Sequence, residues 1–146
     1  MFETVAGFFV EEHWPVQLMA QEGTIKTGFR GHNGQWNCLG TVFDHLQQFV
    51  FYSQAPLKVP EERRPAIAEF ITRANHGLHV GNFELDFLSG DVNYKTSIDV
   101  EGDRLSEALV RQLVMANVST MDRYLPGLKE VAAEIDPAVA IADIEG

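Results

Sequence analysis

The pattern of hydrophobic residues in the middle of the chain changes from a helical period to a period of two. One face of a predicted helix carries apolar residues at helical spacing: Ile67, Phe70, Ile71, Ala74 and Leu78. Gly77 follows, and a glycine there can adopt the left-handed conformation that ends a helix. Pro60 and Pro65 are alternative starting points, because proline is favoured in a first helical turn.

Two alternating segments follow this helix and predict a β-hairpin. In the first, we expect Phe83, Leu85 and Phe87 to point to the buried side and the residues between them to solvent. The second follows Ser89-Gly90-Asp91, and its apolar side carries Val92, Tyr94, Thr96, Ile98 and Val100. A short glycine-containing connection between two alternating segments is a strong hairpin signal.

The N-terminal half predicts a helix and then about four strands. Residues 2–13 have near-helical spacing, and Trp14-Pro15 stops them because a residue before proline avoids the helical region. Alternation over residues 16–29 predicts a short strand, a turn and a longer strand. Further strands are predicted over residues 35–43 and 49–54. The first of these has apolar groups on both faces, which predicts a central strand covered on both sides.

The C-terminal part predicts the longest helix and a short final helix. Apolar residues recur at helical spacing from Leu105 to Leu125, with Asp103 and Ser106 as rival N-caps. We expect Pro126-Gly127 to interrupt this helix. Asp136-Pro137 is typical of a helix start, and the alanine-rich residues 136–146 predict a loosely packed tail helix.

The order of these elements predicts the fold class. Short-linked strands without strand-helix-strand alternation favour an α+β fold, with a mostly antiparallel sheet of about five or six strands and helices packed on one face. At 146 residues, the chain fits a single domain over residues 1–146.

Composition narrows the classes of function. Eleven Lys and Arg against 21 Asp and Glu give a formal net charge of −10, which opposes binding to nucleic-acid phosphates or anionic lipid. The single cysteine, Cys38, excludes an internal disulfide and is interpreted as a small buried hydrophobe. The chain has no apolar segment long enough for a signal peptide or a membrane span. We therefore expect a cytoplasmic protein whose partner is neither nucleic acid nor membrane.

Polar residues offer few candidates for catalysis or metal binding. His76 and His79 flank the end of the central helix, and with Asp99 they are the polar groups of an alternative pocket between sheet and helix. Two histidines without a placed third ligand do not define a zinc site, and histidines near a helix C-terminus suit the helix dipole. We expect no catalytic residue, no metal and no cofactor.

Other polar residues in the helices have structural and functional interpretations. Asn75 and Asn117 lie among apolar neighbours, so we expect each to hydrogen-bond the backbone inside the fold, with contact to a ligand as the alternative. Arg63, Arg64 and Arg73 are either solvated charges offset by nearby glutamates or a surface for an acidic partner.

A surplus of aromatic and methionine side chains is the most suggestive sign of function. Such side chains are typical of protein–protein contacts, although all of them could equally belong to the core of the domain. The candidate partner-binding residues are Phe8, Phe9, Trp14, Met115, Val118, Met121 and Tyr124.

Three segments carry a resemblance to a known family. The sequence EFITRANHGLHVGNFELD at 69–86, DVNYKTSIDVE at 91–101 and MDRYLPGL at 121–128 resemble the YbjN family of bacterial sensory transduction regulators. The resemblance covers about residues 60–132 well and the N-terminal strands more loosely. It implies a fold like that of type III secretion chaperones, compact domains that often dimerise and bind other polypeptides. It implies no reaction and no cofactor.

Two hypotheses of different class follow. The first is a non-enzymatic protein-binding module, chaperone-like or a regulatory adaptor, that forms a homodimer and binds another polypeptide. The alternative is a small-ligand sensor or an enzyme with a pocket between sheet and helix.

Overall fold

The computed structural model describes residues 1–146 and confirms the α+β fold with a six-stranded antiparallel sheet. The sheet has the order β1-β2-β3-β4-β6-β5. Its strands are β1 Gln17–Met19, β2 Thr24–Arg30, β3 Gln35–Phe43, β4 Gln48–Gln54, β5 Asn82–Leu85 and β6 Val92–Asp99. The helices are α1 Phe2–Glu11, α2 Arg64–Asn75, α3 Glu107–Ala132 and α4 Pro137–Glu145.

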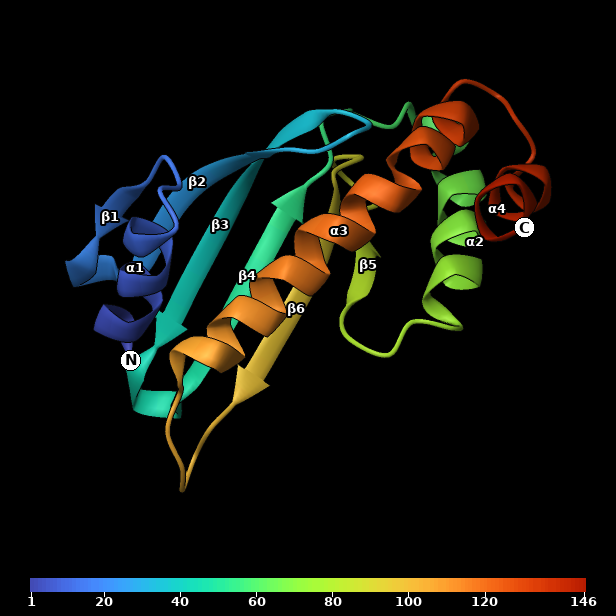
Figure 1. The fold of residues 1–146 in the computed structure, drawn as a ribbon. Coiled ribbons are helices and arrows are strands. Elements are labelled where there is room, and N and C mark those ends of the chain that lie inside the picture. The colour runs from blue at the N-terminus through green and yellow to red at the C-terminus, as the bar shows by residue number, and fades with distance from the viewer.

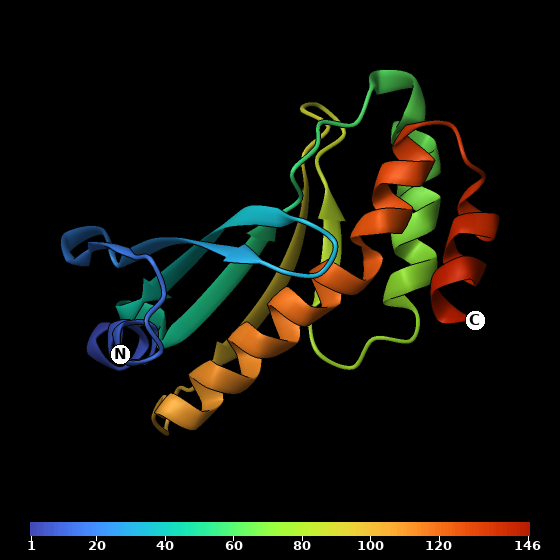
Figure 2. The same cartoon turned by 45° about the horizontal axis from the view of Figure 1, so that its top comes forward.

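The helices lie on one face of the sheet, as expected. Figure 1 shows α3 running obliquely across β4 and β6, with α1 beside its N-terminal half and with α2 and α4 beside its C-terminal end. In the turned view of Figure 2 the strands lie on one side of α3, whose C-terminal end extends past them to α2 and α4. No helix in the structure combines the length and the apolar character that crossing a bilayer requires.

One face of each strand packs against these helices in a single hydrophobic core. Alternation along β3 buries Trp36, Cys38 and Val42, and alternation along β6 buries Val92 and Tyr94. Burial of each large apolar side chain stabilises the fold by roughly 1.5–3 kcal/mol. The residues that α3 adds to the core are Val110, Leu113, Val114, Val118, Met121, Tyr124, Leu125, Leu128 and Val131.

The prediction that β3 is covered on both sides is wrong. β3 is an interior strand, but Gln35, Asn37 and Phe43 on its second face are exposed. No helix covers that face because all four helices share the other one. Leu39 is therefore only half-buried, among cross-strand neighbours such as Tyr52.

The end of α2 and the length of β5 also differ from the predictions. Gly77 is not left-handed: α2 ends at Asn75, and Gly81 has the positive φ of +82°. A Cβ on Gly81 would lie 2.5 Å from the carbonyl oxygen of Lys95, so the turn into β5 requires a glycine. Phe87 does not point into the core, because β5 ends at Leu85 and the chain then turns.

The prediction that Pro126-Gly127 interrupts α3 is also wrong, since the helix is continuous. A proline cannot donate to the carbonyl oxygen four residues earlier, which here belongs to Asp122. The side chain of Asn33 donates to that oxygen instead, at 2.8 Å. The Asp122 carboxylate accepts the backbone N–H groups of His32 and Asn33 at 3.0 and 2.8 Å. The β2–β3 turn is thereby fixed to α3 beside the proline.

Asn117 is fully buried and joins α3 to the centre of the sheet, as predicted for a buried amide. Its Oδ1 accepts a hydrogen bond from Ser53 Oγ at 2.5 Å. Its Nδ2 donates to the carbonyl oxygens of Phe51 and Tyr94 at 2.9 and 3.0 Å, and it lies 3.2 Å from Thr96 Oγ1. Every polar atom of the amide has a partner, so the position of α3 over β4 and β6 is specified by hydrogen bonds as well as by packing.

Arg63 and Arg64 are not solvated charges, because both hold backbone carbonyl groups. Arg63 donates to the carbonyl oxygens of Val131 at 2.8 Å and Ile135 at 3.0 Å, where α3 ends. Of the three arginines, only Arg73 is a solvated charge, in an exposed ion pair with Glu69 at 2.9 Å.

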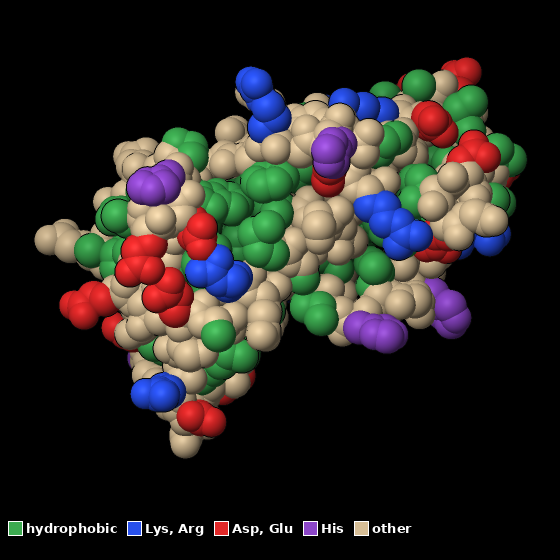
Figure 3. Space-filling model, in the orientation of Figure 1, with side chains coloured by type: hydrophobic (Ala, Val, Ile, Leu, Met, Phe, Trp, Pro, Cys, Tyr) green, Lys and Arg blue, Asp and Glu red, His purple; other side chains and the backbone are tan.

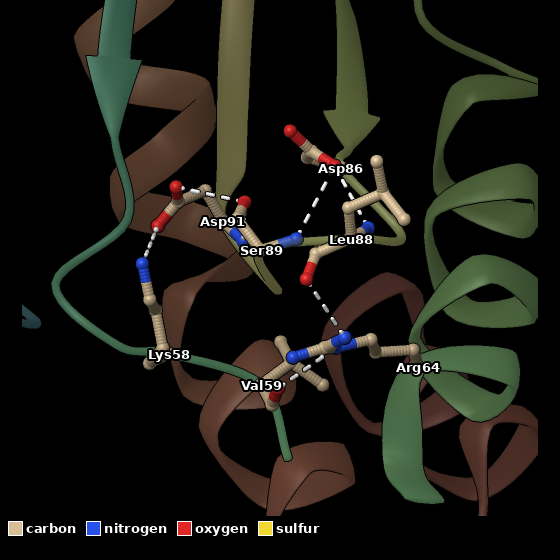
Figure 4. A network of polar contacts seen from close by, with 7 residues as sticks. All are labelled: Lys58, Val59, Arg64, Asp86, Leu88, Ser89 and Asp91. Atoms are coloured by element: carbon tan, nitrogen blue, oxygen red, sulfur yellow. Dashed lines mark hydrogen bonds and ion pairs between the residues drawn. The ribbon is translucent and has the colours of Figure 1, made fainter. Parts of the chain in front are cut away.

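Arg64 fixes the turn between β5 and β6 (Figure 4). It donates to the carbonyl oxygens of Val59 at 3.2 Å and Leu88 at 3.2 Å, and to that of Phe87 at 2.8 Å. Within the turn, the Asp86 carboxylate accepts the N–H of Leu88 at 2.8 Å. This bond and a second from the next N–H hold the pKa of Asp86 below its usual value. The turn is ordered although its apolar side chains face solvent.

The C-terminal helix α4 packs against α2 and α3. Ala140 and Ile141 are buried, and Tyr124 Oη donates to Glu145 Oε2 at 2.6 Å. Gly127 permits this close packing, because a Cβ there would lie 2.5 Å from Ile144 Cδ1 of α4 and 2.6 Å from the ring of Phe70 of α2.

Candidate functional site

The β2–β3 hairpin separates from the rest of the sheet at its turn end. β3 pairs with β2 from Gln35 onward, but its pairing with β4 begins only at Cys38, opposite Ser53. Residues 35–37 therefore have a strand neighbour on one side only. β4 ends at Gln54, and Pro56 has no N–H with which to continue the ladder. Docking of the hairpin turn on Asp122 of α3 favours the same separation.

A cleft of about 710 Å³ occupies this separation. Its volume lies within the range of small-molecule and cofactor sites. One wall is the hairpin, and the other is the end of β4 with the start of β6. The lining residues are Pro15, Gly28, Phe29, Arg30, Gln35, Trp36 and Asn37, together with Gln54, Ala55, Pro56, Asp91, Val92 and Asn93.

Side-chain amides supply most of the polar groups in this cleft. Gln54 and Asn93 face each other across β4 and β6, and Asn37 lies next to them on β3. None of these three amides makes a side-chain hydrogen bond within the protein, whereas Gln35 accepts two from Arg30, at 2.9 and 3.1 Å. Three neighbouring amides are thus free to donate and to accept.

The charged groups of the cleft already have partners. Arg30 binds Gln35, and Asp91 pairs with Lys58 at 3.0 Å. The hydrogen bond from Lys58, with a second from Ser89, holds the pKa of Asp91 below its usual value. The charge of Asp91 is therefore compensated, and the positive charge of Arg30 remains while its N–H groups are occupied by Gln35.

An aromatic row leads from α1 into the cleft. The ring of Trp14 lies 5.1 Å from that of Phe9 and 5.5 Å from that of Phe29, and Phe29 lies 5.5 Å from Trp36. Trp14 and Phe29 are half-buried, and Phe29 and Trp36 line the cleft. Figure 3 shows hydrophobic side chains gathered on this face between α1 and α3. The aromatic row thus meets the cleft at Phe29 and Trp36.

Comparison with known proteins identifies the family of this chain. The model of the YbjN family, described as "Putative bacterial sensory transduction regulator", matches residues 2–130. The chain belongs to the YbjN family. None of the curated proteins matches the sequence significantly.

Solved structures share the fold of this YbjN-family chain. The crystal structure of YbjN from E. coli is 11% identical, with a TM-score of 0.64 over 92% of this chain and 90% of that one. The ExsC-ExsE complex contains a chain that is 13% identical, with a TM-score of 0.61 over 86% of this chain and 90% of that one. The HopA1-SchA chaperone-effector complex contains one that is 13% identical, with a TM-score of 0.52 over 87% and 91%. At these identities the similarity shows a shared fold, which is type III secretion chaperone-like.

The structure distributes the candidate partner-binding residues of the YbjN-family chain between core and surface. Trp14 is half-buried and Met115 is 45% exposed. The other candidates are buried in the core: Phe8, Phe9, Val118, Met121 and Tyr124. Only Trp14 and Met115 are therefore accessible to a partner in this structure.

The polar groups of the alternative pocket do not line one cavity. Asp99 lines a cavity of about 230 Å³ on the uncovered face of the sheet, which neither His76 nor His79 lines. Asp99 accepts hydrogen bonds from Gln48 and from the N–H of Glu101, both at 2.9 Å, which lower its pKa. No group of three or more His, Cys, Asp or Glu residues is placed to hold a metal ion.

Cys38 is a buried hydrophobe, as predicted. Burial raises the pKa of its thiol to about 12, so the thiolate is scarce at neutral pH. The thiol lies 3.7 Å from Ser53 Oγ, beside the hydrogen bonds of Asn117.

Sequence reasoning missed the cleft itself. Asn37, Gln54 and Asn93 occupy ordinary polar positions in alternating strands, and no motif distinguishes them. The one local signal was Ala55-Pro56, which predicts that the strand before it ends. The end of β4 alone does not reveal that the neighbouring strand β3 extends beyond it and leaves a cleft.

Proposed function

We propose that this YbjN-family protein is a non-enzymatic adaptor that binds another polypeptide, in a chaperone-like or regulatory role. The observation that carries the proposal is the cleft of about 710 Å³, which is open and continuous with the aromatic row of Trp14, Phe29 and Trp36. Two of the similar structures are complexes, ExsC-ExsE and HopA1-SchA, the second of a chaperone with an effector. These complexes support a polypeptide as the partner.

The composition of the surface suits a polypeptide better than a charged metabolite. Amides such as Asn37 and Gln54 can donate to carbonyl groups and accept from N–H groups, which are the repeating polar groups of any polypeptide. Aromatic and methionine side chains are enriched in protein interfaces. Trp14, whose ring lies 5.5 Å from that of Phe29 in the cleft lining, supplies the aromatic type, and Met115, 45% exposed on α3, supplies the other.

A capture experiment with matched variants tests the proposal. Met115→Glu places a charge on the exposed apolar side chain of α3, and Val139→Glu places one on an α4 residue of comparable exposure (54%). Polypeptides that bind the wild type and Val139→Glu but not Met115→Glu would support binding at the surface. Recovery of no polypeptide, or of the same polypeptides by both variants, would contradict it. Circular dichroism checks that both variants are folded.

We also propose that the protein forms a homodimer in the cytoplasm. Leu88, which is 93% exposed on an ordered turn, supports an apolar contact with a second copy, together with Phe87 at 56%. The buried thiol of Cys38 suits a reducing compartment. Solution mass across micromolar dilution tests the dimer, and Leu88→Asp should lower the mass to that of a monomer. A monomer at every concentration would refute dimerisation.

The second candidate function is a small-ligand sensor that uses the same cleft. Its volume favours this alternative, because it falls in the range of metabolite sites. A ligand that binds only the native state must raise the melting temperature. Thermal-shift screening against metals and metabolites therefore separates the two functions: a shift that Gly28→Val abolishes would favour the sensor over the adaptor.

A further inference from the structure

We infer that the cleft receives a short extended segment of the partner, which lies as an additional strand beside residues 35–37 of β3. This inference rests on the proposed adaptor function and deepens it. The partner segment takes the place that a longer β4 would have filled. The amides of Asn37, Gln54 and Asn93 hydrogen-bond its backbone.

The first argument is the unpaired edge of β3. Residues of a strand direct their N–H and C=O groups alternately to the two neighbouring strands. Residues 35–37 have β2 on one side, but no residue of β4 is in register with them on the other. Beyond Gln54 the chain stays with β6, since the N–H of Ala55 is donated to the carbonyl oxygen of Val92 at 2.8 Å. At about 3.3 Å per residue, the free edge spans roughly 10 Å, the length of about three partner residues.

The second argument is the chemistry of the amides. Asn37, Gln54 and Asn93 come from three adjacent strands, and their side-chain amides make no hydrogen bond to the protein. Each can offer a donor and an acceptor to the same peptide group. Three such amides on one side of the segment can therefore satisfy its backbone whatever its sequence.

The third argument is that an asparagine elsewhere in the protein already binds a strand of this sheet in this way. Asn75, the last residue of α2, accepts the N–H of Phe83 in the edge strand β5 through its Oδ1 at 2.8 Å, and its Nδ2 lies 3.2 Å from the carbonyl oxygen of Phe83. A single asparagine thus pairs with both backbone groups of one strand residue. The cleft presents three amides for the same type of contact.

The lining and the net charge define the chemistry of the segment. Phe29, Pro15 and Pro56 offer apolar contacts, Asp91 is paired with Lys58 and Arg30 already donates to Gln35, so the residues inside the cleft should be uncharged and β-prone. The net charge of −10 favours basic residues on either side of them. The expected occupant is an uncharged extended segment with basic flanks.

A synthetic peptide tests the inference on the full-length protein. The probe is Lys-Lys-Thr-Val-Thr-Val-Thr-Lys-Lys, and its matched control carries N-methyl groups on both valines, which removes two backbone donors. The protein has two tryptophans, and Trp36 lines the cleft while Trp14 lies on the adjoining row, so intrinsic fluorescence reports binding without a label. We expect the probe to bind and the methylated peptide to bind at least about tenfold more weakly.

Two variants locate the site on the protein. In Gly28→Val, the new side chain fills the cleft, and its Cβ meets only the carbonyl oxygen of Trp36 at 3.4 Å, so the fold should tolerate it. The double variant Asn37→Leu with Gln54→Leu removes two of the amides. Each should weaken binding of the probe about tenfold or more. Gln17→Leu, an amide removed from the exposed face of β1, should leave the affinity unchanged.

Amide hydrogen exchange distinguishes strand addition from other modes of binding. Saturating probe should slow exchange at the amides within 35–37 that face the cleft. Slowing at residues 17–19 instead, equal binding of the methylated peptide, or no binding at millimolar concentration would overturn the inference. So would slow exchange at 35–37 without peptide that depends on protein concentration, because a second copy would then fill the cleft.

The same variants separate this inference from the proposed function. If Met115→Glu abolishes capture of a polypeptide but Gly28→Val and the double amide variant capture it normally, the adaptor function stands and the cleft is not its strand site. If no variant and no wild-type protein captures a polypeptide, the adaptor function itself fails.

Discussion

Replacement of Asn117 should destabilise the protein more than the loss of a side chain of its size would suggest. The residue is fully buried and is bonded to Ser53 and to the carbonyl oxygens of Phe51 and Tyr94. In Asn117→Ala these buried groups lose their partner, and each unpaired buried group costs about 1–3 kcal/mol. Ser53 can turn towards Cys38 Sγ, 3.7 Å away, which offsets part of the loss. We expect a decrease of about 3–5 kcal/mol in the free energy of unfolding.

Urea unfolding followed by circular dichroism measures this decrease, provided that the m-values of wild type and variant agree. Asn117→Leu separates hydrogen bonding from cavity formation, because leucine keeps the volume but not the donors and acceptor. Asn117→Leu should still lower the free energy of unfolding by about 2–4 kcal/mol. Asn37→Ala is the control, since Asn37 is exposed and unbonded, and its effect should stay within about 0.5 kcal/mol. If both Asn117 variants cost less than about 1 kcal/mol, the network does not hold α3 on the sheet.

Three further predictions concern the hairpin turn, the thiol and the C-terminal helix. Asn33→Ala should lower the unfolding free energy by about 0.5–1 kcal/mol in urea melts. The loss should be smaller in a Pro126→Ala background, because the N–H of residue 126 can then satisfy the Asp122 carbonyl. Equal losses in both backgrounds would refute the bridging role of Asn33. Cys38 should resist alkylation at pH 8 until the protein is unfolded, and rapid labelling of the native protein would contradict its burial. Burial, with the hydrogen bond to Glu145 and its charge, raises the pKa of Tyr124 to about 12, against about 10 in an unfolded chain. The unfolded state therefore loses this proton first, so stability should fall as pH rises from about 10 to about 12, and Tyr124→Phe should reduce that fall in melts across the range.

Local periodicity predicted the elements whose partners are close in sequence. The helix around Phe70 and the hairpin from Phe83 to Tyr94 were correct because their apolar spacing reports burial directly. Asn117 was correctly expected to bond the backbone, because a buried amide has few alternatives.

The errors arose where a distant segment changes the local outcome. Pro126 should end a helix, but Asn33, far away in the sequence, satisfies the carbonyl that the proline leaves free. Arg64 looked solvated because its acceptors are backbone carbonyls, which carry no signature in the sequence. The apolar second face of β3 suggested a cover, yet no element was left to supply it.

The cleft could not be predicted for the same reason. Its shape depends on where β3 leaves β4, and this point is set by the register of three strands and by the turn that binds Asp122. Trp14 and Met115 were the accessible members of a larger set of candidates. Composition alone cannot separate aromatic residues in a core from those at a surface.

The pairing of Asn75 with Phe83 also limits how copies of this protein could associate through their sheets. A filament of sheets needs two different free edges on every copy, so that each molecule extends the next. Here α2 packs beside β5, and the asparagine amide occupies the backbone groups in the middle of that edge. The β5 edge is therefore closed to strand pairing with a second copy, which removes one of the edges that a fibre of stacked sheets would use.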